Sequence, residues 1–188
     1  FERTAAFERA IADFTGARHC VVVNNGTVSL SLAALALGVG PGDEVICPNY
    51  TMIATPNSVQ MLGAQPVFVD VAESDLILRP EAVRAALTPR TKAVMLVSSN
   101  GRAPDAAGFE ALARQTGIAL IEDAAQSLGS FYPDGRHIGR AGAIGSFSFS
   151  APSSVSPGSI SVASSSALNV CASRITAGMI SHSIEPVA

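Results

Sequence analysis

The chain has 188 residues, of which 48% are hydrophobic and only 14% are charged, whereas ordinary globular proteins carry roughly 25% charged residues. This length and composition fit one compact domain with a large buried core, and they exclude a chain that is disordered throughout. The formal net charge is −3 and no lysine-rich run is present, which argues against nucleic acid or an anionic membrane as a partner. No apolar run approaches the ~18 residues of a membrane-spanning helix.

The predicted elements alternate between helix and strand from the start of the chain. Residues 1–14 carry apolar side chains at the i, i+3, i+4, i+7 spacing of an amphipathic helix. The apolar run 20–23 predicts a buried strand, and a helical pattern opens after residues 24–27. Further strands are predicted at 44–47, 66–69, 93–97, 118–121 and 144–150, with helices near 52–62, 80–87 and 105–116. This alternation predicts parallel βαβ units, whose strands are buried on both faces.

The composition changes at residue 151. Residues 151–188 contain eleven serines, as many as the preceding 150 residues, and only two charged side chains, Arg174 and Glu185. No helical or strand period survives there, which is typical of a linker or an unstructured end. We therefore expect a folded domain over 1–150 and a serine-rich tail over 151–188 that is disordered or non-native, for example after a frameshift.

Cysteine and histidine positions predict neither disulfides nor a metal site. Cys20, Cys47 and Cys171 are odd in number and far apart, and no histidine has a partner at metal-ligand spacing. The chain starts at Phe1 without a signal peptide. The interpretation is a cytoplasmic protein whose true beginning is missing.

Three segments at predicted strand ends carry candidate site chemistry. The first, Asn24-Asn25-Gly26-Thr27, lies between a strand and a helix. Free N–H groups and the helix dipole favour an anion at such a position. A helix N-cap, with Thr27 or an asparagine satisfying the first turn, explains the same residues.

The second segment, residues 122–126, follows another predicted strand. Ligands of parallel sheets bind beyond the carboxyl ends of the strands, so Asp123 is expected in the same region as Gly26 and Thr27. A carboxylate there can hold a cationic ring nitrogen by a charge-assisted hydrogen bond. A helix cap is the alternative for Asp123, and a structural role is expected for Glu122.

The third segment alternates serine and phenylalanine over residues 145–150. This alternation is typical of a strand with one polar and one packed face. A functional alternative places Ser148 or Ser146 on a phosphate group.

Seven segments, taken in order, resemble the DegT-type (StrS-like) sugar aminotransferases, which are pyridoxal-phosphate enzymes of the aspartate aminotransferase fold type. The sequence similarity extends nearly continuously from Phe7 to Pro152. The segments are 25–27, 40–46, 50–55, 63–70, 88–92, 122–126 and 146–149. The resemblance implies a three-layer α/β/α fold with a mostly parallel sheet: the large, cofactor-binding domain of fold type I, without the small C-terminal domain that helps to close the substrate pocket.

The resemblance also implies roles for six residues toward pyridoxal 5′-phosphate. Gly26, Thr27 and Ser148 would bind the cofactor phosphate. Asp123 would keep the pyridine nitrogen protonated, so that the ring acts as an electron sink. Met52 stands where the family packs a side chain on the ring, and Gln126 would reach the ring hydroxyl.

The sequence departs from the family at the lysine that forms the Schiff base. Ser153 stands at that position, and a hydroxyl can neither form an imine nor act as an amine base. The single lysine of the chain, Lys92, precedes a predicted strand and is expected at the amino end of that strand, away from the site. Relatives that act as sugar dehydratases have a histidine in place of the lysine, so Ser153 matches neither version.

The function implied is amino transfer from an amino acid, with glutamate as the expected donor, to a keto-sugar in lipopolysaccharide, other surface-polysaccharide or antibiotic-sugar synthesis. Residues 50–57 and 100–102 resemble members that act on nucleotide-linked or acidic sugars. Because of Ser153 we expect little or no turnover by this chain. The alternatives are a lysine-less dehydratase of the same family and a non-catalytic fragment or pseudoenzyme that binds the cofactor or a partner subunit. A homodimer is the expected assembly.

Overall fold

The computed structural model describes residues 2–149 and 169–173. In chain order the elements are α1 (Glu2–Thr15), β1 (His19–Val23), α2 (Gly26–Ala36), β2 (Glu44–Pro48), α3 (Ala54–Gln60), β3 (Gln65–Val69), α4 (Pro80–Ala86), β4 (Thr91–Val97), the 3-10 turn η1 (Ser99–Gly101), α5 (Ala106–Thr116), β5 (Ala119–Asp123), β6 (Ile144–Ser148) and β7 (Asn169–Ser173). None of the helices in these residues is long and apolar enough to cross a bilayer.

The strands form one sheet in the order β1-β7-β6-β5-β4-β2-β3. The five strands from β3 to β6 are parallel, and β7 runs antiparallel to both β6 and β1. Val97 of β4 pairs with Asp123 of β5, which in turn pairs with Ser146 of β6. The carboxyl ends of these strands therefore meet at one edge of the sheet.

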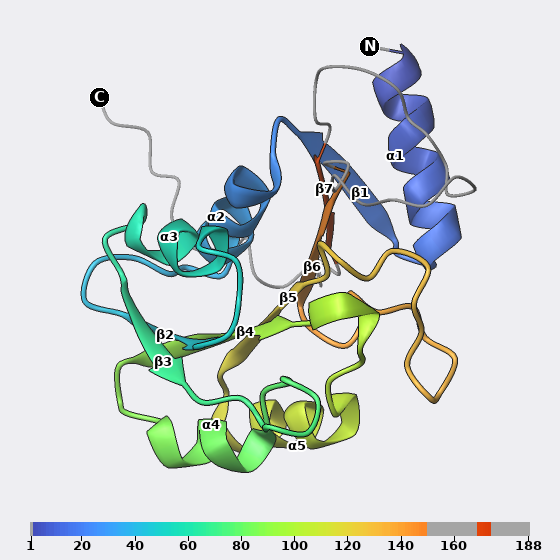
Figure 1. The fold of residues 1–188 in the computed structure, drawn as a ribbon. Helices are drawn as coiled ribbons and strands as arrows, with labels where there is room; N and C mark the ends of the chain where they lie inside the picture. Colours follow the sequence, from blue (N-terminus) through green and yellow to red (C-terminus); the bar gives the residue numbers. More distant parts are fainter. Residues whose placement is uncertain (1, 150–168, 174–188) are drawn as a thin grey trace, which may run out of the picture.

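Helices cover both faces of the parallel part of the sheet, as expected from the continuous apolar strands (Figure 1). On one face α2 and α3 enclose a core cluster that includes Ala34, Cys47, Val59 and Met95. On the other face α4 and α5 enclose a second cluster, centred on Phe109 and buried aliphatic side chains. This arrangement confirms the prediction of a three-layer α/β/α architecture.

The prediction of a buried first strand is wrong. β1 is terminal in the described sheet and pairs antiparallel with β7, so one of its sides lacks a neighbouring strand there. Val21 is 54% exposed although it lies in a run of valines. An apolar run alone cannot distinguish a central strand from a terminal one, because the distinction depends on distant neighbours.

A strand also forms where none is expected from the sequence. β7 falls within the serine-rich range 151–188, and its five residues pair with both β6 and β1. A segment this short does not give a recognisable period. Other residues of that range, including Ser153, lie outside the described residues.

His137 links the loop after β5 to α1. Its Nδ1–H donates to the carbonyl of Ile138 at 2.5 Å, and its Nε2 accepts the N–H of Gly129 at 2.8 Å. Three phenylalanine rings, those of Phe14, Phe131 and Phe147, surround the imidazole edge to face at centroid distances of 5.2–5.5 Å. Burial lowers the pKa of His137. These contacts give the side chain a structural role in the neutral form.

Candidate active site

Asp123 occupies the carboxyl end of β5 and is only 6% exposed. Its Oδ2 accepts a hydrogen bond from the Thr55 hydroxyl at 2.7 Å, and its Oδ1 accepts the N–H of Ala125 at 3.3 Å. Thr55 lies on α3 and also contacts the Thr51 hydroxyl at 2.8 Å. Burial raises the pKa of Asp123, while these hydrogen bonds oppose the shift. The carboxylate is thus fixed in place with few partners for a buried charge.

A cavity of about 300 Å³ opens beside this carboxylate. It brings together three of the predicted site residues: Asp123, Gln126 and Met52. The backbone N–H of Asn100 donates to Gln126 Oε1 at 2.7 Å and fixes the amide side chain, whereas Met52 is 69% exposed. The remaining lining residues are Tyr50, Thr51, Val97, Ser98, Ser99, Asn100 and Ala125.

Gly26 and Thr27 begin α2 at the same edge of the sheet. Asn25 caps the helix, because its Oδ1 accepts the N–H of Val28 at 2.9 Å. The N-cap alternative for this segment is therefore correct for Asn25. The cap uses the N–H of Val28 and leaves the N–H groups of Gly26 and Thr27 ahead of the first intrahelical bond, so capping and anion binding are compatible.

Ser146 and Ser148 lie near the carboxyl end of β6. The Ser146 hydroxyl donates to the Ser29 hydroxyl at 2.7 Å and is buried, so it joins the strand to α2. Ser148 is half-buried at the strand end and is aligned, across β7, with Val23 just before the α2 segment. Gly26, Thr27 and Ser148 thus share an edge with Asp123, but none of the three lines the 300 Å³ cavity.

Glu122 points to the opposite face of β5, as the pleat requires. Its carboxylate is fully buried and accepts hydrogen bonds from the Tyr132 hydroxyl and the N–H groups of Gly139 and Gly142. Burial raises the pKa of Glu122, while these hydrogen bonds oppose the rise. The contacts hold the loop between β5 and β6 against the sheet, which is the structural role expected for this residue.

Lys92 lies at the amino end of β4 and is exposed, as predicted. Val97, whose backbone is aligned with Asp123, is five positions further along the strand. At ~3.3 Å per residue this separation is roughly 16 Å along the strand. The single lysine is therefore remote from the cavity.

Sequence reasoning did not identify Thr55, although its hydroxyl is the side-chain partner of Asp123. A threonine inside a helical pattern carries no signal of its own. Residues 98–100 were identifiable in principle, because they follow the predicted strand 93–97 at its carboxyl end. Asn100 adopts a left-handed conformation, with φ of 55°, which presents its N–H to Gln126. Within the described residues, no group of three or more His, Cys, Asp or Glu side chains is placed to bind a metal ion.

Comparisons with known proteins agree with this fold. A curated relative from Pseudomonas aeruginosa, UDP-2-acetamido-2-deoxy-3-oxo-D-glucuronate aminotransferase, is 49% identical over 125 residues, which are 66% of this chain and 35% of the relative. An aminotransferase structure from Psychrobacter cryohalolentis matches with a TM-score of 0.83 and 34% identity, over 92% of this chain and 42% of that chain. The structure of NtdA from Bacillus subtilis, described with bound cofactor PMP, matches with a TM-score of 0.78 and 26% identity, over 90% of this chain and 36% of that chain.

The chain thus spans 35–42% of the length of these relatives. The structural matches confirm the expected fold, the mostly parallel α/β fold of the aminotransferases. A sequence model of the DegT/DnrJ/EryC1/StrS aminotransferase family matches residues 1–158. The chain therefore belongs to the DegT/DnrJ/EryC1/StrS aminotransferase family.

Proposed function

We propose that this chain carries the cofactor site of a pyridoxal-phosphate-dependent aminotransferase, an enzyme that moves an amino group from an amino acid, with glutamate as donor, to a keto-sugar. The observation that carries this proposal is the buried carboxylate of Asp123 in a cavity at the carboxyl edge of a parallel sheet, in a chain of an aminotransferase family. A buried carboxylate with a raised pKa is a strong site for a cationic ligand, because a cation restores the charged form that burial disfavours.

The residues of the cavity fit the ring of the cofactor. When bound, pyridoxal phosphate supplies a protonated pyridine ring that withdraws electrons from the reacting carbon of the substrate. Asp123 would hold the ring nitrogen, with Thr55 orienting the carboxylate through its 2.7 Å hydrogen bond. Gln126, fixed by Asn100, would reach the ring hydroxyl. Met52 would pack its thioether on the ring face.

The phosphate of the cofactor would lie at the start of α2. The N–H groups of Gly26 and Thr27 and the helix dipole favour an anion there. Ser148, aligned across β7 with Val23 just before this segment, would add a hydroxyl. All of these groups lie at the edge of the sheet that carries Asp123. A single ligand with a cationic ring and an anionic end requires this arrangement, because it must contact both kinds of group at once.

The residue that forms an imine is missing from this assignment. Ser153 stands at the position of the family lysine, and Lys92 lies roughly 16 Å of strand away from the aligned position of Asp123. We therefore propose that this chain binds the cofactor without turning over, and a non-catalytic cofactor-binding chain is the second candidate function. A lysine-less dehydratase is less well supported, because its histidine is absent from position 153.

For the substrate we propose a nucleotide-linked keto-sugar that carries a carboxylate, as in lipopolysaccharide and related polysaccharide synthesis. The support is the 49% identity to the Pseudomonas aeruginosa relative, whose name specifies a 3-oxo-glucuronate linked to UDP. Cys47 is a buried thiol outside any disulfide, which supports a reducing, cytoplasmic location.

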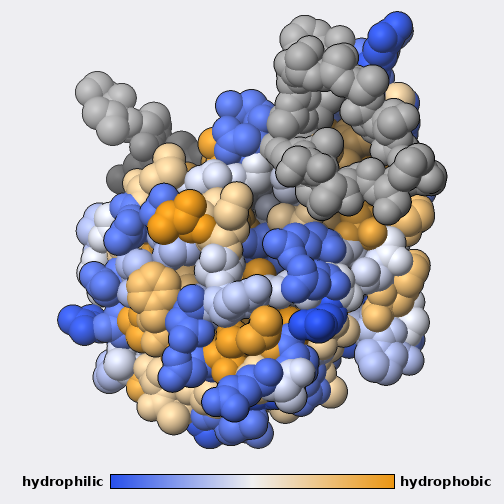
Figure 2. Space-filling model, in the orientation of Figure 1, coloured by the Kyte–Doolittle hydropathy of each residue, from blue (hydrophilic) through white to orange (hydrophobic). Residues whose placement is uncertain are grey.

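For the assembly we propose a homodimer. Several apolar side chains on and beside α2 and α3 are exposed, among them Leu35, Ile53 at 68% and Met61 at 66%. Figure 2 shows a hydrophobic patch where Figure 1 places α3, next to the elements of the cavity. Exposed apolar surface of this kind marks interaction sites. Light scattering tests the assembly, and a monomer at all concentrations would contradict it.

The cofactor assignment is tested by titrating the chain with pyridoxamine phosphate and following binding by fluorescence and calorimetry. The amine form lacks the aldehyde, so binding does not depend on a lysine. We expect saturable binding of pyridoxamine phosphate and weaker binding of pyridoxamine, which lacks the phosphate. No saturable binding would contradict the function. Inactivity is tested separately by incubation with pyridoxal phosphate and glutamate: we expect no conversion to the amine form above the rate in solution.

A further inference from the structure

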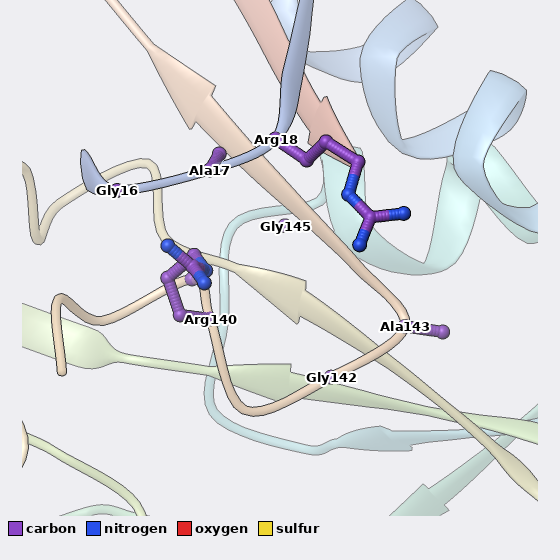
Figure 3. A pocket seen from close by; sticks show the side chains of 8 residues that line it. Gly16, Ala17, Arg18, Arg140, Gly142, Ala143 and Gly145 are labelled. Atoms are coloured by element: carbon purple, nitrogen blue, oxygen red, sulfur yellow. The ribbon is translucent and has the colours of Figure 1, made fainter. Parts of the chain in front are cut away.

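A second cavity, of about 220 Å³, lies at the opposite edge of the sheet (Figure 3). Two segments form it: residues 16–18, which join α1 to β1, and residues 139–145, which lead into β6. It shares no lining residue with the cavity at Asp123. Ile144 and Ser148, the two ends of β6, separate the two edges by roughly 13 Å. The lining residues are Gly16, Ala17, Arg18, Gly139, Arg140, Gly142, Ala143 and Gly145.

The lining is cationic. Arg18 and Arg140 are the charged residues among those that line it, and no acidic residue accompanies them. Within the part of the chain that the structure describes, neither arginine forms an ion pair. Several other arginines there are neutralised by carboxylates: Arg79 by Asp75, Arg90 by Glu44, Arg114 by Glu110, and Arg136 by Glu110 and Asp134. Two uncompensated guanidinium groups on one small concavity attract an anion.

Arg140 is held in place for such a ligand. Its Nη1 donates to the carbonyl of Thr15 at 3.1 Å, which uses one of its five N–H groups. A Cβ at position 16 would come within 2.8 Å of this nitrogen, so Gly16 leaves the space that the guanidinium occupies. Arg18 is exposed and free to adjust its position. In Figure 3 the two guanidinium groups lie on either side of Gly145.

The guanidinium groups are the main hydrogen-bond donors of the cavity. The N–H groups of Gly139 and Gly142 already bind the carboxylate of Glu122, which lies on the sheet behind the loop. Glycine at four of the lining positions leaves room between the arginines, and the volume is well above what a single water needs. The donors and the space suit a compact doubly charged oxyanion, because a guanidinium binds phosphate oxygens in bidentate fashion.

We propose that this cavity is a binding site for the phosphate group of a small molecule, separate from the active site. A phosphate dianion balances the two guanidinium charges, and the preordered Arg140 lowers the entropic cost of binding. The site is independent of the cofactor assignment, because its residues and its edge of the sheet are different.

The proposal is tested with inorganic phosphate as the probe, titrated at constant ionic strength against chloride and followed by calorimetry. The variants are Arg18→Gln and Arg140→Gln, with Arg114→Gln as the control. Arg114 is a highly exposed arginine on α5 that does not line the cavity, so its loss removes the same charge outside the proposed site. We expect each cavity variant to weaken phosphate binding about tenfold, the effect of losing a charge-assisted hydrogen bond, and the control to leave it unchanged.

A fourth variant separates this site from the proposed cofactor site. Thr27→Ala should weaken binding of pyridoxamine phosphate and leave the phosphate affinity of the cavity intact. Arg18 is exposed, so its replacement should leave the fold unchanged even if Arg140→Gln, which loses the contact to Thr15, destabilises the chain. Three outcomes would overturn the proposal. Arg18→Gln could leave the phosphate affinity unchanged, or Arg114→Gln could reduce it as much as the cavity variants do. Phosphate binding could also be lost in Thr27→Ala alone.

Discussion

Replacing Asp123 by asparagine should raise the stability of the cofactor-free chain and lower its affinity for the cofactor. The carboxylate is 6% exposed, and burial raises its pKa, so the folded state favours the protonated form. Above the raised pKa the folded protein must bury a charge that the unfolded chain hydrates, which costs stability. Asparagine isolates this effect, because it keeps an oxygen for the Thr55 hydroxyl and carries no charge at any pH.

The sign of the pH dependence follows from the raised pKa. Below the ordinary pKa of 3.8, Asp123 is protonated in both the folded and the unfolded wild type. Its charge therefore causes no difference in stability between the wild type and Asp123→Asn at such pH. As pH rises from 3.8 through the folded-state pKa, the wild type loses stability relative to the variant. Urea unfolding at about pH 4 and about pH 7 measures the difference, which should favour the variant more at the higher pH.

Cofactor affinity should change in the opposite direction. A charge-assisted hydrogen bond contributes about 1.5–3 kcal/mol, so its loss should weaken binding of pyridoxamine phosphate roughly ten- to a hundredfold. Asp13→Asn, on the exposed surface of α1, is the matched control and should bind like the wild type. Unchanged affinity in Asp123→Asn would refute the assignment of the ring nitrogen to this carboxylate, and reduced stability near neutral pH would refute the argument from burial.

Three further predictions concern other parts of the chain. Borohydride reduction with stoichiometric pyridoxal phosphate should leave no adduct on Lys92; a peptide with the cofactor on that residue, found by mass spectrometry, would contradict its placement. Burial lowers the pKa of His137 from 6.5, so the free energy of unfolding should fall as pH drops below that value toward the folded-state pKa, and His137→Asn should flatten this slope in urea titrations. Gly139→Ala should cost about 2–4 kcal/mol by chemical denaturation, because φ is +97° and the new Cβ would lie 2.4 Å from the Phe147 ring; a loss below about 1 kcal/mol would show that the loop relaxes.

Local patterns predicted most of the elements, because the parallel strands are short apolar runs between helices. The boundaries were less accurate. The predicted helix 52–62 is observed as Ala54–Gln60, and Met52 lines the cavity instead of entering the helix. Sequence periodicity does not indicate whether a residue next to a helix faces a ligand cavity.

The site was only partly predictable for a related reason. Asp123 and Gln126 share a segment at a strand end, where general rules for parallel sheets place ligands. The Thr55 hydroxyl comes from α3, 68 residues before Asp123, and only the packing of that helix on the sheet brings the two together. The position of β7 between β6 and β1 likewise depends on pairing between distant segments, which single-sequence patterns do not contain.

The order of strands in the sheet has a consequence for synthesis on the ribosome. β1 is the first strand of the described sheet to be made, yet its partner there is β7, which is the last. Asp123 likewise acquires its second neighbouring strand only when β6 has been made. During translation β1 therefore has no strand partner in the described sheet while the central parallel strands assemble, and α1, which precedes it, is made equally early. Nascent chains arrested before residue 169 should be more accessible to chaperones and proteases at their amino-terminal segment than chains that include β7.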